Sequence, residues 1–440
     1  MYESQIGFIG TGYVGLVTAA CFAKLGQDVL CLEIDNDKIQ SINNGISPIY
    51  ETGLQDLLFE VVKKKRKLYA TNDRKLFFDK CDIFFICLPT PSNSDGSINL
   101  KFILDEIKEI AILLSKSDSY KTIIIKSTVV PGTTNGKIKN ILEKYSNKCV
   151  GTDFGLGVNP EFLMEGSAID NFLNPDRIIL GSNEINTKNT LSKIYNNFNC
   201  PIFHVTIDEG EMIKYVSNSF LATKISFINE IANLSEFFNI NMDNIVKGIG
   251  SDHRISNKFF RSGLGFGGSC FPKDVKALLH LSKKYENELN ILKSTLEINN
   301  KQPYRAIQIL NNNIDAFNKK ITILGLSFKP NTDDIRESPS LKICDELVKQ
   351  GCEVHVYDPI YVGKSLPTHD YITISNSFNE AIKDSSAVIL VTEWAEFKNL
   401  NPSDFHLMKH KLVIDGRRVL NEKSFINSNV KLIILGNGNK

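Results

Sequence analysis

Short apolar runs alternate with helical stretches over the first half of the chain. A run at Ile6–Ile9 is followed by an alanine-rich helical stretch and by a second run over Asp28–Ile34. Nearly continuous apolar runs return within 82–91 and 121–133, and they stop at Thr-Pro and at Ser-Thr. Such runs are typical of parallel strands that helices cover on both faces. We therefore predict a doubly wound α/β domain over 1–204.

The pattern changes at Asp208. From there to Phe238 the chain contains no proline and carries apolar side chains at helical spacing. We expect one long helix, which serves as an interdomain spine or a subunit interface. Further helices follow, interrupted by a glycine-rich segment around Cys270. We assign 205–300 to a helical central domain that carries this segment and mediates dimerisation.

The α/β pattern restarts near residue 319. A strand, a glycine-bearing turn, a helix and a second strand that ends in an acid follow one another, and the turn carries Lys329, Thr332, Asp333 and Arg336. This unit lacks a full GxGxxG and carries these four residues in its turn instead. We expect a second nucleotide-sized ligand to bind between two facing α/β domains. The predicted fold is α/β, with two Rossmann-like doubly wound domains (1–204 and 301–440) joined by a long central helix and a helical middle domain. A chain of 440 residues fits two or three such domains.

Composition excludes several function classes. Lys and Arg number 51 against 50 Asp and Glu, so no overall basic field favours nucleic acid. The basic run KKKRK at 63–67 is typical of a solvated helix end. No apolar stretch is long enough to cross a membrane. The nine cysteines lack CxxC spacing and the seven histidines form no HxxxH pair, so we expect no metal site. We expect the cysteines to be free thiols in a reducing cytoplasm.

The first turn carries the spacing of a dinucleotide-binding site. Gly10, Gly12 and Gly15 lie between a strand and a helix, and Glu33 closes the next strand 18 residues after Gly15. The glycines would form the tight turn and let the helix N-terminus meet a pyrophosphate. Glu33 would bind a ribose diol and repel a 2′-phosphate, which favours NAD. The alternative is a glycine-rich turn without a ligand.

Two threonines follow the next strands. Thr90 and Thr128 are expected to point toward the cofactor, because carboxyl ends of parallel strands line the ligand crevice. The alternative is that each is only a turn residue. On the long helix, Lys214 and Asn218 are four residues apart and share one face. Taken alone, such a polar pair is more often solvated than functional.

One cysteine stands in an unusual setting, GFGGSCFPKD at 265–274. Pro272 suits the first helical position, so Cys270 should lie at a helix N-terminus, where the dipole and Lys273 favour the thiolate. The alternative is a structural cysteine. Oxidising an alcohol only to a carbonyl needs no nucleophile, whereas continuing to the acid does. NAD and a reactive cysteine together indicate oxidation of an alcohol to an acid with two NAD consumed.

Eight segments in order resemble the UDP-glucose/GDP-mannose dehydrogenase family over almost the whole chain. They are GTGYVGLVTA, SPIYETGL, LPTPSNSDGS, KSTVVPGT, NPEFLMEGSA, EMIKYVSNSFLATKISFINE, SGLGFGGSCFPKDV and GLSFKPNTDDIRESPS. The resemblance implies oxidation of the C6 alcohol of UDP-glucose to UDP-glucuronate, through a thiohemiacetal and a thioester on Cys270. It also implies a homodimer.

The resemblance assigns catalytic roles to six residues. Cys270 is the nucleophile, Lys214 and Asn218 stabilise the oxyanion, and Glu161 is the base or water-orienting group for thioester hydrolysis. Thr128 and Asp274 hold the catalytic water. Together with the glycine turn, the resemblance assigns NAD contacts to Gly10, Gly12, Tyr13, Val14, Gly15, Glu33, Lys38, Thr90, Thr128, Lys273 and Arg336.

The resemblance also assigns contacts with the sugar nucleotide. They fall to Glu161, Phe162, Leu163, Met164, Glu165, Lys214, Asn218, Phe259, Phe260, Arg261, Ser262, Gly263, Gly267 and Lys329. Arg254 is similar to an arginine that reaches the substrate from the neighbouring subunit. His253 beside it is treated as incidental.

The chain departs from the family pattern at three positions. Met164 stands where arginine is common, Thr52 where proline is common, and Glu33 where aspartate is common. Loss of the arginine leaves the sugar nucleotide open: GDP-mannose and other UDP-hexoses remain alternatives, although the GGSCFPKD form favours UDP-glucose over N-acetylated hexosamines. A one-step hydroxyacid-type dehydrogenase and a non-catalytic nucleotide-sugar sensor also stay open.

Overall fold

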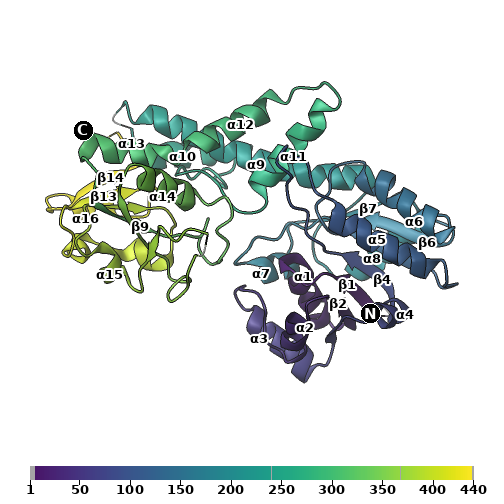
Figure 1. Cartoon of the computed structure of the whole chain (residues 1–440). Coiled ribbons are helices and arrows are strands. Elements are labelled where there is room, and N and C mark those ends of the chain that lie inside the picture. Colours follow the sequence, from purple (N-terminus) through teal and green to yellow (C-terminus); the bar gives the residue numbers. More distant parts are fainter. Residues whose placement is uncertain (1–4, 239, 367, 439–440) are drawn as a thin grey trace. The chain divides into compact units, whose positions relative to one another are not determined.

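The computed structural model describes residues 5–238, 240–366 and 368–438. The chain divides into two compact units, Met1–Ser217 (unit 1) and Asn218–Lys440 (unit 2), and α9 (Ile207–Ser235) runs from one into the other. Figure 1 shows unit 1 in purple and blue and unit 2 in green and yellow. The division into three domains with ends at 204 and 300 stays a prediction.

Unit 1 is built on an eight-stranded sheet in the order β3-β2-β1-β4-β5-β6-β7-β8, in which only the β6–β7 pairing is antiparallel. The strands are β1 (Gln5–Ile9), β2 (Val29–Leu32), β3 (Leu68–Thr71), β4 (Cys81–Ile86), β5 (Lys121–Ile125), β6 (Phe154–Val158), β7 (Ile178–Ser182) and β8 (Ile202–Val205). Its helices are α1 (Tyr13–Lys24), α2 (Asn36–Asn43), α3 (Leu54–Phe59), η1 (Glu60–Lys64), α4 (Arg74–Lys80), α5 (Lys101–Leu114), η2 (Thr133–Ile138), α6 (Lys139–Ser146), α7 (Ala168–Leu173) and α8 (Ile185–Tyr195).

The sheet of unit 1 is covered on both faces, which explains its continuous apolar strands. Phe85 of β4 packs in one buried cluster with α1, while its neighbour Phe84 packs in a second with α5. The strand order reverses between β1 and β4, so the segments after these strands flank a topological switch point. Ligands of open α/β sheets bind at such a point.

Unit 2 contains a six-stranded, all-parallel sheet in the order β11-β10-β9-β12-β13-β14. The strands are β9 (Lys320–Leu324), β10 (Glu353–Tyr357), β11 (Thr373–Ile374), β12 (Ala387–Leu390), β13 (Leu412–Asp415) and β14 (Lys431–Ile434). The helices are α10 (Met242–Gly250), α11 (Phe271–Lys283), α12 (Asn290–Lys301), α13 (Tyr304–Asn313), α14 (Pro339–Lys349), α15 (Phe378–Ile382), η3 (Ala395–Asn399), η4 (Pro402–Phe405) and α16 (Glu422–Phe425). The two predicted doubly wound sheets are confirmed.

In both sheets an acid that follows one strand accepts hydrogen bonds from the turn that follows the neighbouring strand. In unit 1 the acid after β2, Glu33, accepts a hydrogen bond from the backbone N–H of Thr11 in the glycine turn. In unit 2 the acid after β10, Asp358, accepts hydrogen bonds from Leu326 and Ser327 in the corresponding turn. A carboxylate that satisfies buried backbone donors fixes the turn against the next strand.

The structure corrects one detail of the predicted helices. α11 begins at Phe271, so Pro272 is its second residue and not its first. Both positions lack an intrahelical partner for the backbone nitrogen, so proline is tolerated at either. The long helix is confirmed as α9, which has 29 residues. Among the described residues, no helix is long and apolar enough to cross a membrane.

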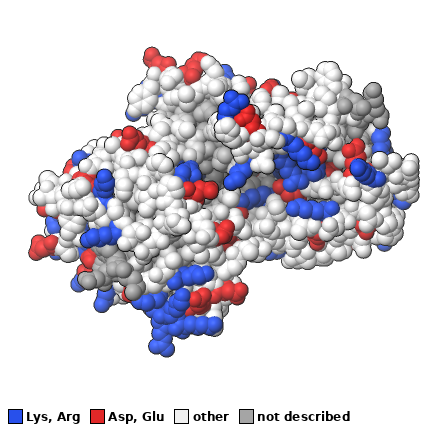
Figure 2. Space-filling view, turned by 180° about the vertical axis from the view of Figure 1, so that it is seen from behind, with Lys and Arg blue, Asp and Glu red and all other residues white. Residues whose placement is uncertain are grey.

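Charges of both signs are spread over the surface. Figure 2 shows acidic and basic side chains interspersed, with basic ones gathered near the lower edge of the visible face. The KKKRK run begins in the last two residues of η1 and is largely exposed, and two of its lysines pair with acids, Lys65 with Glu60 and Lys67 with Asp28, each at 2.9 Å. The run is therefore a solvated helix end, as predicted.

Candidate active site

The glycine turn of unit 1 has the geometry that a pyrophosphate needs. A side chain at Gly15 would place its Cβ 2.0 Å from the carbonyl oxygen of Gly10, so glycine is required there for packing. A Cβ at Gly12 would meet no atom within 4 Å, so the space above this residue is open. No side chain caps the N-terminus of α1, and its first turn holds no acid. The turn therefore fits the diphosphate of a dinucleotide.

Both carboxylate oxygens of Glu33 accept hydrogen bonds in this structure. One carboxylate oxygen accepts hydrogen bonds from the backbone N–H groups of Ile34 and Asp35, and the other accepts from the N–H and the hydroxyl of Thr11. Burial would raise the pKa of Glu33, but these hydrogen bonds outweigh it and lower the pKa below its usual value. Of the four donors only the Thr11 hydroxyl is a side-chain group that can rotate away, since the other three are backbone N–H groups.

The other predicted NAD residues are divided between the two units. In unit 1, Thr90 and Thr128 follow β4 and β5 and are half-buried, while Val14 and Lys38 lie in the first turns of α1 and α2. In unit 2, Lys273 pairs with Asp274 at 2.5 Å and Arg336 pairs with Asp334 at 2.7 Å.

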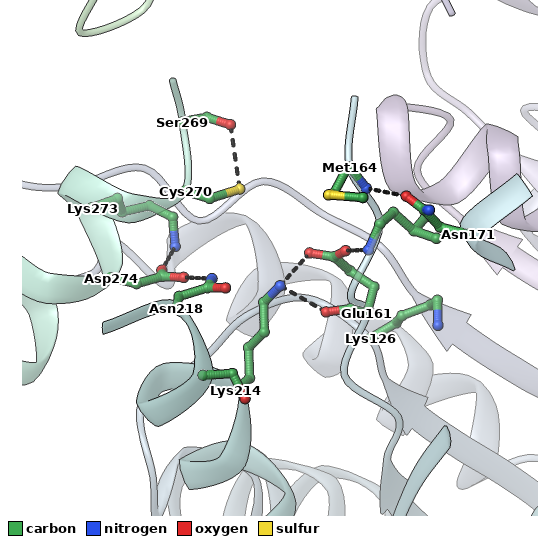
Figure 3. Close-up of polar contacts among 12 residues, drawn as sticks. Lys126, Glu161, Met164, Asn171, Lys214, Asn218, Ser269, Cys270, Lys273 and Asp274 are labelled. Atoms are coloured by element: carbon green, nitrogen blue, oxygen red, sulfur yellow. Dashed lines mark hydrogen bonds and ion pairs between the residues drawn. The ribbon is translucent and has the colours of Figure 1, made fainter. Parts of the chain in front are cut away.

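Lys214 and Glu161 form a buried ion pair in unit 1 (Figure 3). The ammonium of Lys214, which is 4% exposed, donates to a carboxylate oxygen of Glu161 at 2.8 Å and to the backbone carbonyl of the same residue at 2.7 Å. The second carboxylate oxygen accepts from the N–H of Leu163 at 2.6 Å. Lys214 is therefore not a solvated residue of an exposed helix face.

The charge of Glu161 follows from its neighbours. Burial would raise the pKa of Glu161, but the ammonium of Lys214, the N–H of Leu163 and the charge of Lys126 together lower it. The carboxylate is thus ionised near neutral pH and is able to accept a proton. Lys126 is itself buried, and its ammonium donates to the side-chain oxygen of Asn159 at 2.7 Å.

Asn218 and Asp274 form the corresponding polar centre of unit 2. The side-chain amide of Asn218 donates to the carboxylate of Asp274 at 2.6 Å, and Lys273 donates to the other carboxylate oxygen. All three side chains are drawn in Figure 3. Asp274 is buried, so these two donors replace its hydration and fix the orientation of the Asn218 amide.

Cys270 is the N-cap residue of α11 and is exposed. The hydroxyl of Ser269 lies 3.7 Å from its sulfur, as Figure 3 shows. Two glycines before it have no room or no conformation for a side chain: a Cβ at Gly267 would lie 2.4 Å from the carbonyl oxygen of Glu337, and Gly268 has a φ of +80°. The thiol therefore stands at the positive end of a 13-residue helix, on a loop that only glycine can form.

A cavity of about 250 Å³ in unit 2 collects five of the predicted substrate residues: Phe259, Arg261, Ser262, Gly267 and Lys329. It is also lined by Arg417 and Glu393, which follow β13 and β12 and were not predicted. Arg417 is anchored through a 2.6 Å hydrogen bond to the carbonyl of Val391. The GRR sequence after an apolar strand was the only available signal for Arg417.

The remaining predicted substrate residues lie elsewhere. In unit 1 the ring of Phe162 stacks on the guanidinium of Arg177 at 4.0 Å, and the exposed Met164 donates its N–H to Asn171. Leu163 and Glu165 flank Met164 on the same segment. In unit 2, Phe260 packs in a small apolar cluster and Gly263 donates its N–H to Asn229. Arg254 is exposed and pairs with Asp252 at 2.6 Å.

Three consecutive segments of the chain match the domains of one family. Residues 4–199 match the UDP-glucose/GDP-mannose dehydrogenase family, NAD binding domain; residues 208–301 match its central domain; and residues 322–422 match its UDP binding domain. The open glycine turn lies in the first match, Cys270 in the second and Lys329 in the third. The cofactor is therefore NAD.

Individual relatives agree with this assignment. UDP-glucose 6-dehydrogenase YwqF from Bacillus subtilis (strain 168) is 40% identical over 418 residues, which cover 94% of this chain and 93% of that protein. A UDP-glucose dehydrogenase structure from Pyrobaculum islandicum has a TM-score of 0.92 at 31% identity and covers 100% of this chain and 98% of its own. A UDP-D-ManNAc dehydrogenase structure from Pyrococcus horikoshii has a TM-score of 0.87 at 29% identity, with 99% of each chain covered. From its glycine turn to its second sheet, the chain belongs to the UDP-glucose/GDP-mannose dehydrogenase family.

Proposed function

We propose that this protein oxidises the C6 alcohol of UDP-glucose to the carboxylate of UDP-glucuronate in two NAD-dependent steps. The observation that carries the proposal is the setting of Cys270: an exposed thiol at the N-terminus of α11, on a glycine loop, in a chain that binds NAD. A dehydrogenase that stopped at the aldehyde would have no use for such a thiol.

In the first oxidation C6 loses a hydride and its hydroxyl loses a proton, which leaves an aldehyde. NAD, when bound, supplies a hydride acceptor for each oxidation. The thiolate of Cys270 then adds to the aldehyde carbon and forms a C–S bond. Lys214 and the amide of Asn218 stabilise the resulting oxyanion, because both are donors at buried positions.

The second oxidation removes a hydride from the same carbon and leaves a thioester on Cys270. Glu161 accepts a proton from water, with Thr128 and Asp274 assisting in holding that water, and the hydroxide adds to the thioester carbonyl. The C–S bond breaks, which releases the carboxylate and regenerates the thiolate. One alcohol, one water and two NAD yield one carboxylate, two NADH and three protons.

Glu33 favours NAD over NADP. Its ionised carboxylate lies after β2, the strand beside β1 in the sheet, where it accepts from a ribose diol and repels a 2′-phosphate. Comparable values of kcat/KM with NADP would contradict this role.

We favour UDP-glucose as the sugar nucleotide because the B. subtilis relative and the P. islandicum structure carry this substrate in their names. The P. horikoshii structure, named for a UDP-N-acetylated sugar, keeps other UDP-hexoses as the second candidate. Met164, which replaces a common arginine, is the residue through which such a preference would change. GDP-mannose is the third candidate, since the family includes enzymes that use it.

We also propose that the protein is a homodimer that works in the cytoplasm, with Arg254 completing the substrate site of the neighbouring subunit. Arg254 is exposed on its own subunit, and α9 presents exposed phenylalanines at Phe220 and Phe227. None of the nine cysteines is in a disulfide, which supports a reducing compartment.

The test is to count NADH formed per sugar with a panel of UDP- and GDP-sugars. UDP-glucose should give two NADH per molecule and no free aldehyde. One NADH per molecule would indicate a one-step dehydrogenase, and binding without turnover would indicate a sensor.

Cys270→Ala should abolish formation of the acid while binding of UDP-sugar persists. Cys149→Ala is the matched control, because Cys149 is also exposed but lies in unit 1, away from any predicted role. Acid formation by Cys270→Ala at close to the wild-type rate would disprove covalent catalysis.

Sharing of the site between subunits is tested by mixing two inactive variants, Arg254→Ala and Cys270→Ala. Heterodimers with one complete site should regain part of the activity. If subunits exchange and no activity returns, Arg254 does not act across the interface.

A further inference from the structure

Glu51 connects two ligand-binding segments of unit 1 that are far apart in the sequence. Its side chain is 6% exposed and accepts three hydrogen bonds. The hydroxyl of Tyr13 donates at 2.5 Å, the N–H of Gly166 at 2.6 Å and the N–H of Ala168 at 2.8 Å. Three donors on one buried carboxylate hold all of these groups at fixed positions.

The first of these groups belongs to the NAD site. Tyr13 is the first residue of α1 and directly follows Gly12, above which the space is open. Burial and the carboxylate of Glu51 both raise the pKa of Tyr13 above its usual value, so the hydroxyl keeps its proton and remains a donor. A displacement of the glycine turn would therefore move this donor relative to Glu51.

The other two groups end the segment that carries the predicted contacts with the sugar nucleotide. Gly166 directly follows Phe162–Glu165, and its φ of +84° lets the chain turn toward α7, which begins at Ala168. Glu51 is itself anchored, since its backbone carbonyl accepts from the N–H of Leu54 at the start of α3. The carboxylate is thus a common, fixed acceptor for both segments.

We propose that Glu51 is a positioning residue that couples binding of NAD to binding of the sugar nucleotide. A dinucleotide that orders the glycine turn also fixes Tyr13 on Glu51, and the same carboxylate then holds Gly166 and Ala168 in the arrangement that receives the sugar nucleotide. The proposal rests on the proposed function, because it requires both ligands. Coupling of this kind is reciprocal: each ligand raises the affinity for the other by the same factor.

The experiment measures the dissociation constant of UDP-glucose by calorimetry with and without saturating NADH, a pair that does not react. In the wild type, NADH should tighten UDP-glucose binding about tenfold, and UDP-glucose should tighten NADH binding equally. The coupling factor is the ratio of the UDP-glucose dissociation constants measured without and with NADH. In Glu51→Gln the amide nitrogen replaces one acceptor, so this factor should fall close to one. This ratio is insensitive to a uniform loss of affinity in both binary complexes.

Tyr13→Phe keeps the buried carboxylate and its two backbone donors, so it tests the same connection if Glu51→Gln fails to fold. Its coupling factor should also fall close to one. Tyr145→Phe on α6 is the control, since Tyr145 is a partly exposed tyrosine without a hydrogen bond to Glu51, and it should retain the wild-type factor. A wild-type factor of one, or a full factor in Tyr13→Phe, would overturn the proposal. Failure of the wild type to bind UDP-glucose at all would instead refute the proposed function.

Discussion

Lys126, a buried lysine that the sequence did not single out, lies close to the Lys214–Glu161 pair. The ammonium of Lys126 donates to the side-chain oxygen of Asn159, which also accepts from the hydroxyl of Tyr195 at 2.6 Å. The Asn159 amide in turn donates to the carbonyl of Ile179 on β7 at 3.0 Å. This network fixes the residue two positions before Glu161. Lys126 therefore supports the proposed base both by position and by charge.

The charge of Lys126 should be visible in the pH dependence of turnover. Burial lowers the pKa of Lys126 to about 8, while Glu161 and the thiol of Cys87 oppose this shift and Lys214 reinforces it. Lysine is charged below this pKa, and its charge helps keep Glu161 ionised. In Lys126→Met the acid limb of the kcat profile should therefore move to higher pH, and a titration near pH 8 should disappear.

Lys121→Met is the matched control for that experiment. Lys121 is also buried, at the opposite end of β5, where it pairs with Asp82 at 2.9 Å. Lys121→Met should lower the free energy of unfolding without moving the acid limb of the kcat profile. An unshifted limb in Lys126→Met, or an equal shift in both variants, would limit Lys126 to a structural role.

Replacing the second and the third glycine of the dinucleotide turn by alanine should have different effects. Gly15→Ala forces a Cβ to 2.0 Å from a backbone oxygen, so thermal unfolding should occur at lower temperature. Gly12→Ala meets no protein atom, so the fold should be retained. The added methyl group fills the space above the turn, and NADH affinity should fall by about tenfold or more, the effect of 1.4 kcal/mol. Unchanged NADH binding in Gly12→Ala would place the pyrophosphate elsewhere.

At the scale of elements, α9 is tied to the segment that follows β5. Glu211, in the first turns of α9, is buried and accepts hydrogen bonds from the N–H of Gly132 at 2.8 Å and the N–H of Thr134 at 2.9 Å. These donors lie at the start of η2, only a few residues after Thr128. Glu211 thus links the helix that carries Lys214 to the loop that carries Thr128.

This link predicts a specific dependence of stability on pH. Burial, reinforced by the charge of Asp208, raises the pKa of Glu211 from 4.5 to about 7, although the N–H groups of Gly132 and Thr134 oppose the shift. Between these two values the folded state holds a proton that the unfolded state releases, so stability falls as pH rises from 4.5 to 7. Glu211→Gln should remove this slope, which amounts to at most about 3 kcal/mol.

The measurement is the free energy of unfolding by urea at pH 5, 6, 7 and 8. Glu209→Gln, on the same helix turn but exposed, should follow the wild type over this range. An identical slope in Glu211→Gln and wild type would show that Glu211 does not carry the predicted proton.

At the scale of the whole molecule, α9 carries an apolar stripe that unit 2 leaves open. Phe220, Phe227 and Leu234 are spaced by seven residues and are 63%, 49% and 57% exposed. A seven-residue apolar spacing is the pattern by which one helix packs along another. Such a stripe is typical of an interface between subunits, which supports the proposed dimer.

Phe220→Glu combined with Phe227→Glu should therefore convert the dimer to a monomer, because two charges would be buried without partners. Sedimentation equilibrium measures the mass directly. Phe317→Glu is the control, since Phe317 is also 63% exposed but lies away from α9 in sequence and should leave the mass unchanged. A wild type that sediments as a monomer would contradict the proposed assembly.

Features that depend on neighbouring residues could be predicted from the sequence. The strands and helices of both sheets follow from local apolar periodicity. The glycine turn follows from the spacing of Gly10, Gly12 and Gly15 after a strand, and the position of Cys270 at a helix N-terminus follows from the proline two residues later. The length of α9 follows from the absence of proline. Each of these rests on a pattern within a few residues, which the chain carries whatever its tertiary contacts.

The tertiary structure alone decided which polar groups are buried together. Taken alone, the spacing of Lys214 and Asn218 on α9 favoured a solvated pair, whereas the segment at Glu161, 53 residues earlier, packs against Lys214 and buries it. Glu51 meets Ala168 across 117 residues, and Lys126 meets Asn159 across 33. No local pattern links such positions, because a buried charge is tolerated only where distant segments bring its partners. The sequence thus determined the fold class and predicted the reactive residues, while the charge states and hydrogen-bond partners of those residues depend on which distant segments the tertiary structure brings side by side.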